Sequence, residues 1–273
     1  AVIAITDKGS LSIDVEKNIP KTKMKNKNGI AVVIGNRDYE NNVPQVDFAV
    51  RDAEYIKEYL IQTLGYRQGN IFYYTNSTLA DMKVAFNKLK DAVKPNKSDV
   101  FVYYSGHGAP DPNSKQGYFV PTDADPNYIR ETGFAVDELY TILNQTRAIN
   151  KTVVIDACFS GNSGGGMILK NISPVFIDVE DSFLNSRNSA VFTSATGEQV
   201  SSWYTDKSHS LFTYYFLKGL QGEADLDSDG TLILSEIKNY IDDKVPYMAR
   251  RMNGNKQNPQ LMTDDDSRVL VRY

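Results

Sequence analysis

The chain has few cysteines and histidines: one cysteine and two histidines among 273 residues. A single cysteine excludes an intrachain disulfide, so cysteine usage says little about the compartment. No apolar run reaches the length of about 18 to 20 residues that a membrane-spanning helix needs. The net charge is −4 and the basic residues are scattered, so nucleic-acid binding has no electrostatic support. The hydrophobic fraction of 41% is that of an ordinary globular protein.

The chain begins at Ala1 rather than at methionine. This start is compatible with the removal of an export signal, so an exported and a cytoplasmic protein both remain open. Residues 1–28 lack sustained periodicity and end in a lysine-rich stretch. We therefore expect residues 1–28 to be an extension, either a linker or a pro-segment, and residues 29–273 to form one domain.

Strand-like and helix-like segments alternate from residue 29 onward. Short apolar runs predict strands at residues 30–34, 71–74, 99–105, 117–120, 151–156, 190–194 and 269–271. Amphipathic spacing and capping residues predict helices at residues 47–64, 78–93, 136–144, 212–220 and 236–250. This alternation predicts an α/β fold, a mostly parallel sheet with helices on both faces.

Two of the predicted strands end at a reactive side chain. The first is followed by Ser105-Gly106-His107-Gly108, and the second ends in Asp156-Ala157-Cys158-Phe159-Ser160-Gly161. Because the carboxyl ends of neighbouring parallel strands meet at one edge of the sheet, His107 and Cys158 are expected to lie together there. A lone cysteine at a strand end is usually a small buried apolar residue, but both motifs together favour a nucleophile with its base.

The chemistry of such a pair requires further groups. Only a thiolate is a strong nucleophile, and an imidazole can take its proton. The negative oxygen that forms on attack of an amide needs donors, for which the backbone N–H groups of Gly108 and Cys158 are the candidates. The second histidine, His209, precedes a predicted helix and is interpreted as a loop or capping residue.

At these residues the sequence resembles the caspase-like cysteine peptidases, specifically their bacterial and metacaspase branch. The resemblance rests on the His107 and Cys158 motifs and extends to residues 29–36, 51–53, 193–196, 201–203 and 211–213. It implies a caspase-like three-layer sandwich with a six-stranded, mostly parallel sheet, and a catalytic Cys–His dyad that forms a thioester without an organic cofactor. It places Ser194, Ala195 and Trp203 in the substrate cleft. A monomer and a homodimer both remain open.

The resemblance also bears on the substrate. Caspases that cut after aspartate use arginines in the pocket, whereas Tyr204 follows Trp203 here. Metacaspases instead carry carboxylates at the positions of Asp52 and Asp156, which implies protein or peptide substrates cut after Arg or Lys. Self-cleavage is common in relatives, and Lys170 and Arg187 are the candidate sites in the stretch after Cys158.

A separate acidic motif lies at residues 225–236. Asp225, Asp227 and Asp229 occupy positions one, three and five of an EF-hand loop, and Gly230 occupies position six. Thr231 would supply a backbone carbonyl, and Glu236 would be bidentate at position twelve. The motif predicts calcium binding; the alternative is an acidic loop that caps the following helix.

Two non-enzymatic functions compete with the peptidase. One is a catalytically idle caspase-like module that binds protein partners, and the other is a calcium-responsive interaction domain. Intact His107 and Cys158 argue against an idle module, because idle relatives typically lose one of the two. Labelling of Cys158 by a thiol reagent would separate these functions from the peptidase.

Overall fold

A six-stranded sheet forms the centre of the computed structural model, which describes residues 14–111, 114, 116–159, 162–163, 166–167, 183, 188–196 and 199–273. The strand order is β14-β10-β7-β3-β1-β2. The strands are β1 (Ile30–Gly35), β2 (Ile71–Thr75), β3 (Asp99–Ser105), β7 (Asn150–Asp156), β10 (Ser189–Thr193) and β14 (Gln260–Thr263). All pairings are parallel except that of β14 with β10.

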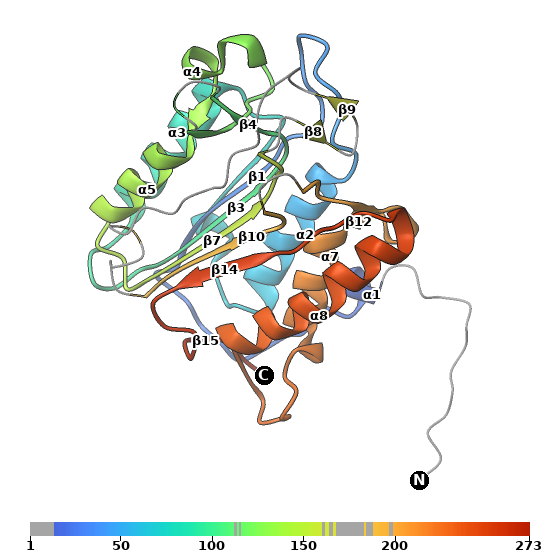
Figure 1. Cartoon of the computed structure of the whole chain (residues 1–273). Coiled ribbons are helices and arrows are strands. Elements are labelled where there is room, and N and C mark those ends of the chain that lie inside the picture. The colour runs from blue at the N-terminus through green and yellow to red at the C-terminus, as the bar shows by residue number, and fades with distance from the viewer. Residues whose placement is uncertain are drawn as a thin grey trace.

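Helices cover both faces of this sheet (Figure 1). On one face lie α2 (Ala49–Gln62), α7 (Leu211–Lys218) and α8 (Leu234–Asn253), and on the other lie α3 (Leu79–Ala92) and α5 (Val136–Gln145). Alternate strand residues face opposite sides: in β1, Ala31 and Val33 join the first core, whereas Val32 and Ile34 join the second. Apolar side chains on both faces explain why these strands are continuous hydrophobic runs. The predicted three-layer α/β architecture is confirmed.

One strand of the main sheet, β14, was not predicted from the sequence. The sequence predicted a last strand at residues 269–271, and β15 (Val269–Arg272) does form there, but it pairs with β13 (Thr231–Ile233) outside the main sheet. The sixth place is taken by β14, which lies antiparallel at the edge. An edge strand that is partly exposed needs no continuous apolar run, which is why the pattern did not reveal it.

Smaller elements surround the sheet. Short strands are β4 (Gly108–Pro110), β5 (Gly117–Phe119), β6 (Phe134–Ala135), β8 (Asn162–Ser163), β9 (Gly166–Met167), β11 (Trp203–Tyr204) and β12 (His209–Ser210). Short helical turns are α1 (Asp14–Lys17), η1 (Gln68–Asn70), η2 (Pro126–Tyr128), α4 (Ile129–Thr132), η3 (Thr205–Lys207) and η4 (Gly219–Glu223). In the part of the chain that the structure describes, no helix is both long and apolar enough to cross a membrane.

Residues 14–28 pack against the domain. Val15 is fully buried, and its carbonyl accepts a hydrogen bond from Tyr59 Oη at 2.8 Å. The backbone N–H of Thr22 donates to the carbonyl of Gln62 at 3.2 Å. The described end of the predicted extension therefore docks along α2.

Candidate active site

His107 and Cys158 lie at the same edge of the sheet because their strands are neighbours in register. Ser105 of β3 pairs with Asp156 of β7, so each reactive residue lies two positions beyond a paired residue. The backbone N–H of Gly106 donates to the Asp156 carbonyl at 3.3 Å, which keeps the two chains together past the strand ends. Both side chains line one cavity of about 30 Å³. The structure thus brings together the predicted nucleophile and base.

The ring of His107 is fixed by groups from the loop that follows β1. Its Nε2 lies 2.6 Å from the carbonyl oxygen of Pro44, and the ring lies against that of Tyr39 with centroids 4.7 Å apart. The backbone N–H of His107 donates to Tyr39 Oη at 2.8 Å. A carbonyl can only accept, so Nε2 carries the hydrogen and Nδ1 is the proton acceptor. Burial lowers the pKa of His107 to about 4, which makes the ring neutral near pH 7.

The thiol of Cys158 is also neutral in this arrangement. Burial raises its pKa to about 12, against a hydrogen bond that favours the thiolate. The donor of that bond is the backbone N–H of Ser201, which lies 2.6 Å from Sγ. A pair with a neutral thiol and a neutral imidazole can react by proton transfer to His107 as Cys158 attacks.

Gly108 lies where a side chain would clash with the turn that carries Cys158. A Cβ atom at this position would lie 2.8 Å from the carbonyl oxygen of Cys158 and 2.8 Å from the ring of Phe159. The glycine therefore permits β4 to approach the turn that carries the nucleophile. This proximity is compatible with the predicted oxyanion hole formed by the N–H groups of Gly108 and Cys158.

Asp156 lies in the cavity wall beside Cys158. Its Oδ1 accepts a hydrogen bond from Ser201 Oγ at 2.8 Å, and its Oδ2 accepts bonds from Thr213 Oγ1 at 2.7 Å and from Ser210 Oγ. Val46 and Trp203 supply apolar surface to the same cavity. A carboxylate beside apolar walls suits a long side chain with a cationic end.

Ser201 contacts both Cys158 and Asp156 in this cavity. Its N–H contacts the thiol and its hydroxyl contacts Asp156, and the side chain of Gln257 holds the segment through Ser202 N–H at 2.8 Å. A volume of about 30 Å³ accommodates little more than water. A ligand group that bonds to Asp156 Oδ1 from the cavity would displace the Ser201 hydroxyl.

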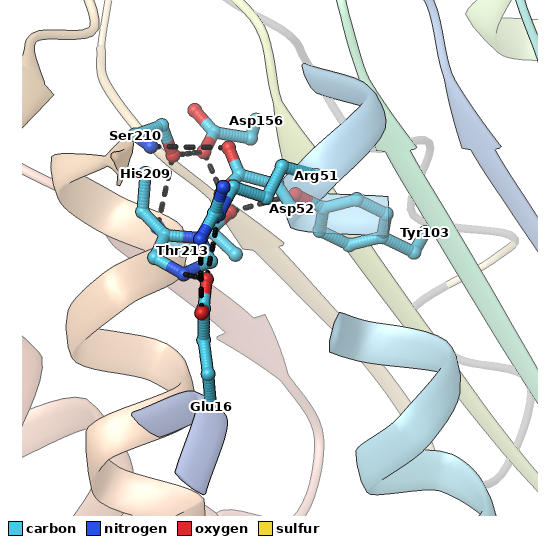
Figure 2. Close-up of polar contacts among 8 residues, drawn as sticks. All are labelled: Glu16, Arg51, Asp52, Tyr103, Asp156, His209, Ser210 and Thr213. Atoms are coloured by element: carbon cyan, nitrogen blue, oxygen red, sulfur yellow. Dashed lines mark hydrogen bonds and ion pairs between the residues drawn. The ribbon is translucent and has the colours of Figure 1, made fainter. Parts of the chain in front are cut away.

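Asp52 belongs to a buried polar network behind this cavity (Figure 2). It is fully buried in the first turn of α2, where Oδ2 accepts the N–H of Ser210 at 3.1 Å and Oδ1 lies 2.6 Å from His209 Nδ1. Burial raises the pKa of Asp52 to about 6, and His209 opposes this shift. On its other side, His209 Nε2 lies 3.1 Å from Glu16 Oε1. The cavity lining contains Asp156 and Ser210 but not Asp52.

The remaining predicted cleft residues lie in different places. Trp203 lines the cavity and packs edge-to-face on Phe48 with ring centroids 6.1 Å apart. Ser194 and Ala195 follow the end of β10 and are not among the cavity-lining residues. The Ser194 carbonyl accepts a hydrogen bond from Gln257 Nε2 at 3.0 Å. Ser194 therefore supports the segment that carries Ser201.

The acidic loop has carboxylates that converge. Ligand atoms of Asp225, Asp227 and Asp229 all lie within 4.8 Å of one another. Gly230 has a φ of +79°, the left-handed conformation that position six of an EF-hand loop requires. Glu236 lies in the first turn of α8, where its Oε2 accepts the N–H of Ile233 at 3.0 Å. This donor set of hard oxygen atoms fits calcium.

The roles of several residues in the site had not been predicted from the sequence. Pro44 acts through its carbonyl oxygen, which any residue has, so residue type gives no signal there. Ser201 and Ser210 are common polar residues whose role comes from the positions of their partners. His209 had been interpreted as a loop or capping residue; the structure instead places its ring, fully buried, between Asp52 and Glu16. The helix cap is Ser210, whose Oγ accepts the N–H of Thr213 at 3.2 Å.

The sequence is similar to those of known proteins. Residues 28–270 match the family model described as the caspase domain. Metacaspase-1 of Eremothecium gossypii is 30% identical over an alignment of 151 residues, and this alignment covers 49% of this chain and 32% of that protein. Metacaspase-9 of Arabidopsis thaliana is 26% identical over an alignment of 183 residues, which covers 59% of this chain and 54% of that protein. The chain thus spans about a third to a half of the length of these two relatives.

Solved structures show the same fold. Caspase-1 from Spodoptera frugiperda superimposes with a TM-score of 0.62 at 14% identity and covers 93% of each chain. A protein from Geobacter sulfurreducens superimposes with a TM-score of 0.57 at 18% identity and covers 87% of this chain and 94% of its own. At these identities the likeness concerns the fold alone.

Proposed function

This chain belongs to the caspase-domain family, and from that premise we propose that it is a cysteine endopeptidase that cuts after Arg or Lys. One observation supports the proposal most strongly: Cys158, His107 and the carboxylate of Asp156 line one small cavity. An idle interaction module has no need for a thiol, an imidazole held in one tautomer and a carboxylate at the same place. Protein or peptide substrates are the partners that this chemistry implies.

The proposed reaction has two steps. Sγ of Cys158 attacks the carbonyl carbon of the peptide bond while Nδ1 of His107 takes the thiol proton. The N–H groups of Gly108 and Cys158 stabilise the negative oxygen, and the proton on His107 passes to the leaving amine. Water then hydrolyses the thioester, with His107 as base, which releases the acid product and restores the thiol.

Asp156 is the residue through which we propose selection of a cationic side chain. Among the described residues, the hydrogen-bond donors to its carboxylate are three hydroxyl groups, which carry no charge. A guanidinium or ammonium group that replaced the Ser201 hydroxyl would form a charge-assisted hydrogen bond in a buried place. Such bonds contribute about 1.5 to 3 kcal/mol, whereas an aspartate side chain at the same position would be repelled.

We therefore expect peptides that end in Arg or Lys at the cleavage site to be cleaved about a hundredfold faster, or more, than matched peptides with Asp. The measurement is kcat/KM for reporter peptides that differ in this residue alone, with a neutral Gln peptide as control. Faster hydrolysis of the Asp peptide would refute the proposed specificity. The order Arg or Lys, then Gln, then Asp would support it.

We also propose that residues 225–236 bind calcium. In favour of this are the converging carboxylates of Asp225, Asp227 and Asp229 and the left-handed Gly230. The short strand β13 within the loop pairs with β15, where Leu232 lies opposite Val271. Calcium would thus link the loop between α7 and α8 to the end of the chain.

Calcium should raise the thermal stability of the wild-type protein. A ligand at a hundredfold excess over its Kd stabilises the folded state by about 2.7 kcal/mol, so Tm should rise by several degrees. The Asp225→Asn variant removes one charged ligand and should lose most of that rise. Equal Tm values for the wild-type protein in calcium and in chelator, with no heat of binding by calorimetry, would contradict the proposal. The same samples show whether calcium changes the cleavage rate.

Self-cleavage after Lys170 or Arg187 is a further part of the proposal. Both residues lie outside the described residues, so the support is their type and their place in the sequence.

A further inference from the structure

The two acidic residues expected to hold the substrate differ in their surroundings. Asp156 lines the cavity, whereas Asp52 lies behind it and is fully buried. Ser210 bonds to both of them (Figure 2): its N–H donates to Asp52 Oδ2 at 3.1 Å and its Oγ donates to Asp156 Oδ2. A change at Asp52 therefore reaches the cavity through Ser210.

His209 contacts a carboxylate through each ring nitrogen. Nδ1 lies 2.6 Å from Asp52 Oδ1, and Nε2 lies 3.1 Å from Glu16 Oε1. Carboxylate oxygens accept, and a neutral imidazole donates from one nitrogen only, so the two contacts need two protons. The second proton can belong to His209 or to Asp52. In both cases the net charge of the His209–Asp52 pair is zero.

Glu16 is balanced by Arg51. The guanidinium makes two hydrogen bonds to the carboxylate, from Nε at 2.6 Å and from the terminal nitrogen at 2.9 Å. The Arg51–Glu16 pair is therefore neutral as well. Among the residues drawn in Figure 2, this leaves Asp156 as the one charge that faces hydroxyl groups rather than a cation.

We propose that His209 is a positioning residue of the specificity pocket: it neutralises Asp52 and leaves Asp156 as the single carboxylate that recognises the cationic side chain. The inference rests on the proposed preference for Arg and Lys. It gives Asp52 and Asp156 unequal roles, although both are buried acids near the same cavity. Glu16 orients His209, so the docked residues of α1 contribute to the support of the pocket.

Three variants test the unequal roles with an arginine reporter peptide and a matched glutamine peptide. Asp156→Asn should lower kcat/KM for the arginine peptide about a hundredfold and remove the preference over glutamine. The double variant Asp52→Asn with His209→Asn replaces one neutral pair by another, and an amide oxygen at position 52 can still accept the Ser210 N–H. It should keep KM within about fivefold of wild type.

The third variant, His209→Leu, leaves the Asp52 carboxylate buried without its partner. We expect KM for the arginine peptide to rise about tenfold and kcat to change little, because His107 and Cys158 lie outside this network. Recovery of KM in the amide double variant separates positioning from a general loss of structure. If His209→Leu does not fold, the comparison of the double variant with Asp156→Asn still decides whether Asp52 recognises the substrate itself.

The outcomes distinguish a failure of the inference from a failure of the proposed function. A double variant that loses the arginine preference as fully as Asp156→Asn overturns the inference, since Asp52 would then recognise the substrate itself. A wild-type KM in His209→Leu overturns the role of His209 while the proposed specificity stands. If the wild-type enzyme itself shows no preference for arginine over glutamine, the proposed function fails, and the inference fails with it.

Discussion

Replacement of Cys158 by alanine should abolish peptide hydrolysis, with a fall in kcat/KM of at least about a thousandfold. The chain contains no other thiol, so no second cysteine can substitute for it. The variant should also stay a single chain of 273 residues if self-cleavage occurs after Lys170 or Arg187. Rates with the arginine reporter and intact masses of both proteins are the measurements.

Two controls belong to this experiment. The substitution removes one buried sulfur atom, so Tm should change by only a few degrees and a lost activity cannot be attributed to unfolding. His107→Gln keeps a donor for the Pro44 carbonyl but no base, and it should be about as inactive. Because the two residues act as a unit, the double variant should lose little more. Residual activity near the wild-type level in Cys158→Ala would exclude this nucleophile, and intact masses that differ only by the removed sulfur atom would exclude self-cleavage.

Alkylation of Cys158 by iodoacetamide should rise steeply with pH, by about tenfold per unit between pH 7 and pH 10. The reason is that burial raises the pKa of the thiol to about 12 and lowers that of His107 to about 4. Deprotonation of the thiol raises the rate as pH increases, and the rate continues to rise until the pH reaches the pKa of Cys158. His107 is already neutral over this pH range, so its titration adds no second change in the alkylation rate.

A pair that is charged at rest would give a different pH profile. A resting thiolate–imidazolium pair would give a rate that is high at pH 6 and nearly flat up to pH 9. That profile would show that a neutral thiol beside a neutral imidazole is not the resting state of the protein. Since Cys158 is the single cysteine, Cys158→Ala gives the background rate directly. Absence of labelling at any pH, in a folded protein, would favour the idle interaction module.

The sequence predicted the centre of the fold and of the site for a physical reason. Strands β3 and β7 are buried on both faces, so they are continuous apolar runs, and each ends at the residues that line the cavity. Two such runs followed by His107 and Cys158 are visible without any structure. Strand β14 was missed because an edge strand with exposed residues carries no such pattern.

The contacts that hold His107 and His209 in place could not be predicted from such a pattern. The partner of His107 is the carbonyl of Pro44, a group that every residue has. The contact of His209 with Asp52 joins residues 157 positions apart, and it exists because α2 and β12 pack together. The sequence shows which residue types are present, but such a contact follows only from the packing of the complete fold.

The most direct test of the central claim is covalent labelling with two peptide ketones that differ only in the residue next to the reactive group, arginine or aspartate. The predicted result is that the arginine compound modifies Cys158 in one-to-one ratio, as peptide mapping would show, while the aspartate compound reacts at least about a hundredfold more slowly. Faster reaction of the aspartate compound, or no modification of Cys158 in folded protein, would contradict a cysteine peptidase that recognises basic residues.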